Sequence, residues 1–132
     1  MLYIPNYTLG IGGNNLLWNF NDYTPKYQQI MKQIILGIIS GTYTDGQKLP
    51  SIRNMSNDTS INANTIKRVL YELEILGLVY NKRTVGRFIT RDKQVIENMK
   101  INLTTNEIKE FFSTMIAIGF TNKEIISMIE NF

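Results

Sequence analysis

The chain has 132 residues, of which 43% are hydrophobic and 19% charged, a composition that fits one globular domain with an appendage. It contains no cysteine and no histidine, which excludes disulfides, cysteine-based zinc sites and histidine-dependent general base catalysis. No apolar run reaches the roughly 18 residues that span a bilayer, and no secretory signal is recognisable. We therefore expect a cytoplasmic protein that has no membrane segment.

Positive charge is concentrated in the middle of the chain. Residues 1–25 carry one acid and no base, residues 26–91 carry ten Lys and Arg against four acids, and residues 92–132 carry four Lys against six acids. The net charges of these segments are −1, +6 and −2. The basic middle predicts a surface for a polyanion, although chance clustering of solvated charges would give the same distribution.

The first 23 residues lack helical periodicity and are rich in Asn and Gly. We interpret residues 1–23 as an N-terminal arm, in which Leu16, Trp18 and Phe20 alternate as in a short extended segment. We expect residues 1–15 to be poorly ordered, ordered only against a partner chain, or foreign to the native protein. Residues 10–13 are Gly-rich, but no Lys-Ser/Thr follows them, so they indicate a linker rather than a phosphate-binding loop.

A first helix is predicted after Thr24, which acts as the N-cap and places Pro25 at the first helical position. Apolar residues then recur at three- and four-residue spacing, as on a helix of about 15 residues with a broad buried stripe. They are Tyr27, Ile30, Met31, Ile34, Ile35, Ile38 and Ile39. Gly41 ends the helix, and core packing explains the stripe without any functional role.

A turn and a short extended piece come next. Asp45-Gly46 tolerates positive φ and predicts the turn, and Leu49 precedes a proline, which favours extended backbone. Ser51 then caps a second helix over residues 51–58. The buried residues of that helix are expected to be Ile52 and Met55.

A third helix follows a turn at Thr59-Ser60-Ile61. Asn62 caps it, and it extends over residues 62–76 to a stop at Gly77. Its buried face is predicted to be Ile66, Val69, Leu70, Leu73 and Leu76. Its other face carries Asn64, Lys67, Arg68 and Tyr71. Two short helices in this order predict a helix-turn-helix.

The N-terminus of this third helix has the residue types that recognise DNA. A recognition helix meets base edges there, and Asn62 and Asn64 offer amides suited to adenine. Lys67 and Arg68 suit guanine or phosphate. Alternatively, Asn62 is only a cap and the two cations are only solvated, which for an isolated helix would be equally plausible.

A basic hairpin follows the third helix. Residues 78–81 and 87–90 are predicted strands, joined by a turn over residues 82–86. The basic residues at its tip are Lys82, Arg83 and Arg87. Such a tip can enter the minor groove or clamp phosphate. Helix, helix-turn-helix and basic hairpin in this order predict a winged-helix DNA-binding domain over residues 24–91.

Residues 92–132 are predicted to form short amphipathic helices. The first is expected to be interrupted or kinked at residues 102–105, because Thr104 and Glu107 fit a capping box. Thr121 and Glu124 fit a second capping box after a glycine stop. The apolar residues of this segment are Val95, Ile96, Met99, Ile108, Phe111, Phe112, Met115, Ile116, Ile125, Ile126, Ile129 and Phe132.

So short a segment cannot bury two apolar stripes by itself. The tail must therefore pack on the winged helix or on another chain, and we favour a homodimer that pairs two recognition helices on a two-fold DNA site. Helices that simply close a monomer core are the alternative.

Several stretches within residues 16–91 follow a known pattern. They are Tyr27-Gln28-Gln29-Ile30, Ile39–Tyr43, Gly46–Arg53, Asn62–Thr65, Leu73-Glu74, Gly77–Val79 and Gly86–Phe88. The chain thus resembles the GntR-type bacterial regulators. Its short helical tail, with Gly119-Phe120-Thr121, is similar to that of the YtrA subfamily, which lacks the large ligand-binding domain of its relatives.

The resemblance implies roles for individual residues. Arg53 matches a position that contacts DNA backbone or bases, and Arg83 falls where the wing tip approaches DNA. Ala63 offers at most a methyl contact to thymine. The whole predicted DNA-binding set is Ser51, Arg53, Asn62, Ala63, Asn64, Thr65, Lys67, Arg68, Arg83 and Arg87. Ser60 and Thr84 stand where the family commonly has glycine, so the turn and the wing are expected to differ there.

We therefore expect a mainly α protein with a small β hairpin: a winged helix-turn-helix plus a C-terminal helical dimerisation tail at residues 92–132. Its expected function is that of a homodimeric repressor that binds a palindromic operator in double-stranded DNA and controls a small operon, with transporter genes suggested by the resemblance. A winged-helix protein–protein interaction module is the alternative. No enzyme activity, cofactor or metal is predicted.

The sequence does not identify a small-molecule effector. An effector would bind at the dimer interface or between the tail and the winged helix. The linings of such a site would be Met99, Phe111, Phe112 and Met115. Plain interface packing is the simpler explanation of these residues.

Overall fold

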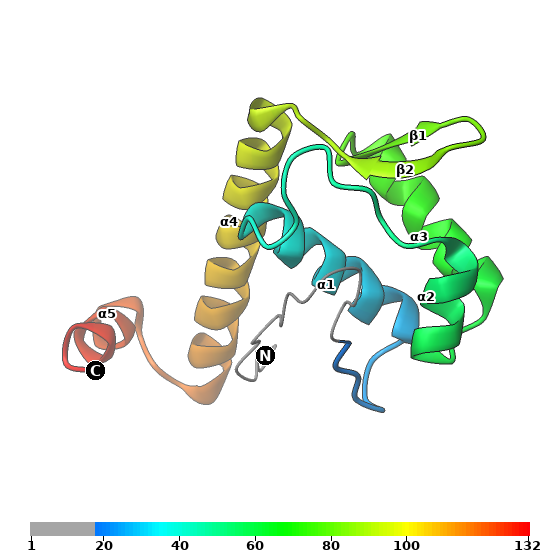
Figure 1. Ribbon diagram of the computed structural model, residues 1–132. Coiled ribbons are helices and arrows are strands. Elements are labelled where there is room, and N and C mark those ends of the chain that lie inside the picture. Colours follow the sequence, from blue (N-terminus) through cyan, green and yellow to red (C-terminus); the bar gives the residue numbers. More distant parts are fainter. Residues whose placement is uncertain (1–17) are drawn as a thin grey trace. The chain divides into compact units, whose positions relative to one another are not determined.

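The computed structural model describes residues 18–132 (Figure 1), so the predictions for residues 1–17, including Leu16 and the Gly-rich linker, lie outside the described residues. Its elements are α1 (Lys26–Ile39), α2 (Ile52–Thr59), α3 (Ala63–Ile75), β1 (Val79–Lys82), β2 (Gly86–Ile89), α4 (Lys93–Ile118) and α5 (Asn122–Glu130). The predicted class, mainly α with a small β hairpin, is confirmed. The described chain divides into two compact units, residues 18–97 and Asn98–Phe132.

The core of residues 18–97 is built from the predicted helix stripes. On α1, the side chains of Ile30, Ile34 and Ile38 are buried. α3 contacts α1, α2 and β1. The buried face of α3 consists of Ile66, Val69, Leu70 and Leu73. Complete burial of one such side chain contributes about 1.5–3 kcal/mol, so this packing, more than helix propensity, holds the three helices together.

Tyr43 packs its ring on α1 at Gly37. A Cβ atom at position 37 would overlap the ring, so the absence of a side chain allows this close approach. The Tyr43 N–H donates to the Gly37 carbonyl at 2.9 Å. Only 4% of Tyr43 is exposed, and burial raises the pKa of its phenol to about 12.

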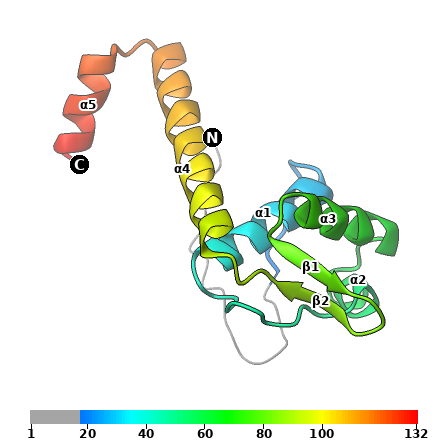
Figure 2. The same cartoon turned by 90° about the horizontal axis from the view of Figure 1, so that it is seen from above.

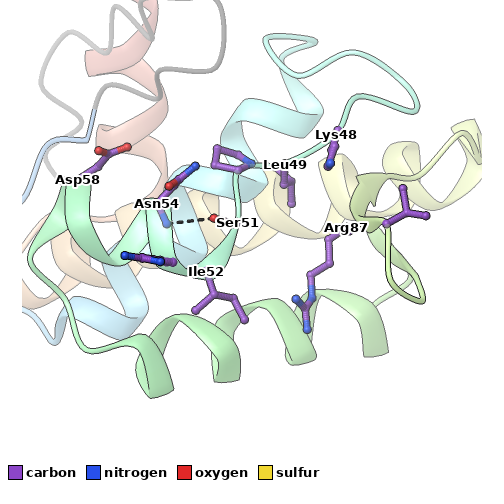
Figure 3. A pocket seen from close by; sticks show the side chains of 11 residues that line it. Lys48, Leu49, Ser51, Ile52, Asn54, Asp58 and Arg87 are labelled. Atoms are coloured by element: carbon purple, nitrogen blue, oxygen red, sulfur yellow. Dashed lines mark hydrogen bonds between the residues drawn. The ribbon is translucent and has the colours of Figure 1, made fainter.

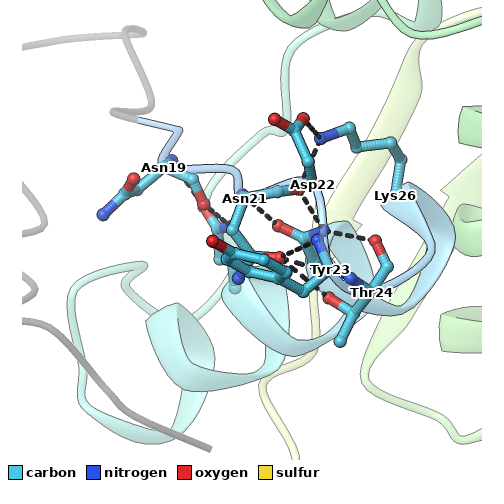
Figure 4. A network of polar contacts seen from close by, with 8 residues as sticks. Asn19, Asn21, Asp22, Tyr23, Thr24 and Lys26 are labelled. Atoms are coloured by element: carbon cyan, nitrogen blue, oxygen red, sulfur yellow. Dashed lines mark hydrogen bonds and ion pairs between the residues drawn. The ribbon is translucent and has the colours of Figure 1, made fainter.

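Residues 18–24 are held along α1 by two side-chain amides (Figure 4). Gln33 Oε1 accepts from the Asn19 N–H at 3.1 Å, and Gln33 Nε2 donates to the Asn19 carbonyl at 2.6 Å. One helical turn earlier, Gln29 forms the equivalent two bonds with Asn21, at 2.8 and 3.0 Å. The part of the N-terminal arm that the structure describes is therefore docked on the core.

The start of α1 differs from the prediction by one residue. Pro25 is the N-cap and α1 begins at Lys26, so the assignment of Thr24 as N-cap was wrong. The Thr24 N–H instead donates to Asn21 Oδ1 at 3.3 Å, within the turn that leads into the helix. Gly41, with φ of +79°, ends α1 as predicted.

The hairpin is antiparallel, and an isolated bridge from a preceding segment joins its free edge. In β1–β2, Tyr80 pairs with Phe88 and Lys82 with Gly86. The extended piece predicted around Leu49 lies along the free edge of β2, where Lys48 forms a bridge with Phe88. The Leu49 N–H donates to the Arg87 carbonyl at 2.8 Å. In Figure 2 the hairpin lies beside α3, with α2 close to its far end.

Leu76 was predicted to be buried, but 42% of it is exposed. α3 ends at Ile75, and Leu76 is its C-cap, followed by Gly77 with φ of +76°. This turn carries the chain away from the helical stripe, and Leu78 enters the core instead.

The helix α4 continues through residues 102–105, so the predicted interruption was wrong. The Thr104 hydroxyl donates to the Lys100 carbonyl at 2.7 Å within the same helix, so it does not cap a new one. No Gly or Pro occurs from Lys93 to Ile118, and the Asn and Thr residues there cost only fractions of a kcal/mol each, roughly 0.7 at most.

The unit Asn98–Phe132 contains the end of α4 and the whole of α5. The predicted capping box at α5 is confirmed, because the Glu124 N–H donates to Thr121 Oγ1 at 3.2 Å and the Thr121 N–H to Glu124 Oε1 at 3.1 Å. Ile125 is the one fully buried residue of this unit. The large exposed apolar residues are Ile101, Ile108, Ile116, Ile118, Ile126, Met128, Ile129 and Phe132. No helix within residues 18–132 is long and apolar enough to cross a membrane.

Candidate nucleic-acid interface

The turn between α2 and α3 is held by hydroxyl groups. Ser60 adopts the left-handed conformation, with φ of +58°, although it is not a glycine. The Thr59 hydroxyl donates to the Met55 carbonyl at 2.7 Å and accepts from the Ile61 N–H at 3.2 Å. The Ser56 hydroxyl donates to the Ile61 carbonyl at 2.6 Å. These bonds fix the direction in which α3 leaves the turn.

The solvent-facing side of α3 is polar and exposed, whereas the opposite side is fully buried. Asn62 caps the helix by accepting from the Asn64 N–H at 2.8 Å, so its side-chain oxygen has a structural use, as predicted. Asn62, Ala63 and Asn64 are exposed at the helix start, and Lys67 is exposed one turn later. Thr65 is half-buried. The predicted base-contacting residues thus share one accessible end of α3.

Arg68 lies against α1. Its guanidinium carbon is 4.4 Å from the centre of the Tyr27 ring, and its Nε is 3.7 Å from Glu72 Oε1. Cation–π contacts of this kind orient a guanidinium without burying it. Arg68 therefore connects α3 to α1 while remaining accessible, a contact that the sequence did not predict.

The wing is tied to α3 by Arg87. Its Nε donates to Glu74 Oε1 at 2.8 Å, and both side chains are about three-quarters shielded, with 22% and 25% exposed. Arg83 is exposed at the tip. Thr84 beside it has φ of +67°, which shows that the tip adopts a left-handed turn without glycine at that position. Of the three predicted basic tip residues, Arg87 is thus the one that forms an ion pair among the described residues.

A groove of about 720 Å³ separates the start of α2 from the wing (Figure 3). Its lining residues are Lys48, Leu49, Pro50, Ser51, Ile52, Arg53, Asn54, Asp58, Val85, Gly86 and Arg87. The groove thus brings together three residues of the predicted DNA-binding set, Ser51, Arg53 and Arg87. Ser51 caps α2 by accepting from the Asn54 N–H at 3.1 Å, so its hydroxyl is also oriented by the helix start.

The electrostatics of the groove favour an anion. Lys48, Arg53 and Arg87 line the groove with one acid, Asp58, and two cations remain besides Arg87, which is paired with Glu74. Lys48 was not among the predicted site residues, because its place beside the wing depends on the bridge to Phe88, which joins residues 40 positions apart. The basic charge of residues 26–91 was the only sequence signal for it.

Comparison with known proteins gives a consistent result. Residues 26–89 match the model of the bacterial regulatory proteins, gntR family. The chain is 34% identical over 113 residues to the HTH-type transcriptional regulator YhcF of Bacillus subtilis, covering 86% of this chain and 93% of that protein. It is 30% identical over 88 residues to the HTH-type transcriptional repressor YtrA of Bacillus subtilis, covering 66% of this chain and 68% of that protein.

A solved structure gives the same assignment. The GntR family transcriptional regulator from Listeria monocytogenes superposes with a TM-score of 0.77 at 33% sequence identity, covering 86% of this chain and 99% of that one.

Proposed function

The chain belongs to the GntR family of bacterial regulatory proteins, and we propose that it binds an operator in double-stranded DNA as a homodimeric repressor. The relatives compared above are transcriptional regulators and not enzymes. The observation that carries the proposal is the exposed start of α3. Amide side chains and a cation are exposed there, whereas the opposite face of the same helix is fully buried. A cytoplasmic location follows from this role.

The start of α3 enters the major groove in this proposal. At 13 residues the helix is about 20 Å long, and the groove is wide enough to admit a helix. Asn64, whose side chain is exposed, is suited to a bidentate contact with adenine, Ala63 to a thymine methyl, and Lys67 to guanine or phosphate. Asn62 contributes its amide NH₂, because its oxygen caps the helix.

The wing and the start of α2 contact the backbone and the adjacent minor groove. Arg83 is exposed at the wing tip, and Arg53 lines the groove between wing and α2. Arg residues in a narrow minor groove respond to its enhanced negative potential. Ser51, Thr65, Arg68 and Arg87 complete the proposed contact set, with Arg87 and Arg68 already oriented by Glu74 and Tyr27.

We assign homodimerisation to the tail. The exposed apolar residues of Asn98–Phe132 recur along both of its helices, and large exposed apolar patches usually mark interfaces. A two-fold pair would place two α3 helices about 34 Å apart on a palindromic site. Sedimentation of the full chain should give a dimer at micromolar concentration, and a monomer throughout would refute this assignment.

The binding proposal is tested by titrating the full chain against a duplex selected from random sequence for retention by the protein. Neutralising about six to ten phosphates per dimer predicts an affinity loss of about 10³–10⁵ between 50 and 200 mM salt. Tight binding that ignores salt, or no retention of any duplex, would contradict the proposal. Loss of DNA binding together with a salt-insensitive protein complex would favour an interaction module.

Two substitutions test the residue assignments. Asn64→Ala should weaken binding to the selected site about 10- to 100-fold, since one bidentate base contact is worth about 1–3 kcal/mol. Arg53→Ala should weaken binding and also reduce the salt dependence. Asn106→Ala and Lys123→Ala, at exposed positions of α4 and α5, are the matched controls. Unchanged affinity in both test variants would remove these assignments.

The targets and any effector are proposed from the resemblance to the YtrA subfamily. We expect transporter genes in the controlled operon, which a genome-wide map of bound sites would check. An effector would bind at the dimer interface, near Met99, Phe111, Phe112 and Met115, which are half-buried. A screen by thermal shift, repeated with Phe112→Ala, tests for such a site, and no ligand-dependent shift would argue against one.

A further inference from the structure

One face of the wing carries two lysines, Lys82 from β1 and Lys48 from the segment bridged to β2. Lys48 pairs with Phe88, and Phe88 pairs with Tyr80, so these three side chains form one row on the same face of the sheet. Two residues towards the tip, Lys82 pairs with Gly86 on that same face. The two lysines therefore belong to adjacent rows, on the two sides of β2.

Both lysine side chains lie over residues of β2. The Lys48 chain lies against Gly86, where a Cβ atom would be 2.9 Å from Lys48 Cε and 3.7 Å from its Nζ. From the other side, Lys82 Nζ lies 5.1 Å from the centre of the Phe88 ring and 5.9 Å from that of Tyr80. These rings stack at 5.6 Å and form an aromatic floor. The absence of a side chain at Gly86 leaves room for the Lys48 chain.

No acid of the described residues neutralises this pair of lysines. Neither Lys48 nor Lys82 forms an ion pair within residues 18–132. The nearby acid Glu74 is taken by Arg87, whose position in β2 puts it on the opposite face from Gly86 and Phe88. Two like charges in adjacent rows of one face repel each other, and an anion bound between them would offset that repulsion.

We propose that Lys48 and Lys82 together bind one phosphate of the DNA backbone on this face of the wing, beside Gly86. The inference rests on the proposed function, adds Lys48 to the contact set and gives Lys82 of the wing tip a defined phosphate partner. DNA backbone is the occupant that the observations favour, because Lys48 and Gly86 also line the basic groove that contains Arg53. A DNA strand bound in this groove would contact cations from both the wing side and the α2 side.

The test uses the full chain and the selected duplex, with Lys48→Gln, Lys82→Gln and the double variant. Each single variant should bind about tenfold more weakly, and the double variant should lose about one unit per protomer from the slope of log affinity against log salt. The loss should be equal for selected and random duplexes, since a phosphate contact carries no sequence information. Lys48→Arg and Lys82→Arg should restore binding, and Lys123→Gln is the charge-matched control.

The outcomes separate this inference from the broader proposal. Steep salt dependence in the wild type with double-variant binding equal to that of Lys123→Gln would refute the lysine site and leave the DNA-binding proposal intact. No DNA binding by the wild type would refute both. Loss of affinity in the Gln variants that the Arg variants fail to restore would indicate a packing role for the alkyl chains and would also overturn the phosphate site.

Discussion

Ser60→Gly should stabilise the protein. Ser60 has φ of +58°, a left-handed conformation that costs a non-glycine residue about 1–2 kcal/mol. Glycine avoids that cost but loses more entropy on folding, by roughly 0.5–1 kcal/mol. The Ser60 side chain is exposed and has no hydrogen bond among the described residues, so little else is lost. With the middle of each range, the net gain should be about 0.7 kcal/mol, or a rise in Tm of about 2–5 °C.

Urea unfolding followed by circular dichroism measures this difference, with protein concentration fixed because dimerisation would otherwise change the apparent stability. Asn57→Gly is the control, since position 57 is exposed within α2 and glycine there should destabilise by a few tenths of a kcal/mol, roughly. A Ser60→Gly variant as stable as the wild type, or less stable, would show that the turn is not strained at this residue.

Three further predictions concern the core and the wing. Gly37→Ala should destabilise by about 1–3 kcal/mol in thermal unfolding, because the new methyl group overlaps the Tyr43 ring; an unchanged Tm would mean that the ring moves aside freely. Burial raises the pKa of Tyr43 from 10.0 to about 12, so the folded state keeps the phenol proton at a pH where the unfolded state has lost it. The free energy of unfolding should therefore fall as pH rises from 10 through 12, by up to about 1.4 kcal/mol per pH unit. Tyr43→Phe should remove this pH dependence. In a double-mutant cycle, Glu74→Gln and Arg87→Gln should be coupled by about 1 kcal/mol in unfolding free energy, and additive effects would show that the wing does not depend on this pair.

The features that sequence predicted well are local. The caps at Ser51, Asn62 and Thr121 depend on residues no more than three positions apart, and each forms the bond that its residue type predicts. The stripes of α1 and α3 follow from helical periodicity in the same way. The winged-helix order was predictable because it is a sequence of such local signals, each of which ends at a Gly or a capping residue.

The features that sequence missed depend on competition or on distance. Thr104 is equally suited to capping a new helix and to a position within a helix, where its hydroxyl donates to a carbonyl of the same helix. The continuity of α4 was therefore not predicted. The place of Lys48 beside the wing was not predicted, because only its bridge to Phe88 brings it there. Leu76 was predicted to be buried, but α3 ends at Ile75, so Leu76 does not continue the buried stripe of the helix. The proposed site residues were selected from the sequence by residue type, but the partners of Arg68 and Arg87 required the tertiary structure.

The docking of the arm on α1 depends on two matching lengths. Residues four apart on a helix are separated by about 6.0 Å along its axis, and residues two apart on an extended chain by about 6.6 Å. Gln29 and Gln33 can therefore face Asn21 and Asn19 in register, running in opposite directions. Since the glutamines bond only main-chain atoms, they restrict the side chain at position 19 only by excluding proline, which lacks the N–H that donates to the glutamine oxygen. Position 21 is more restricted, because the Asn21 side chain also accepts from the N–H groups of Tyr23 and Thr24 in the turn before α1.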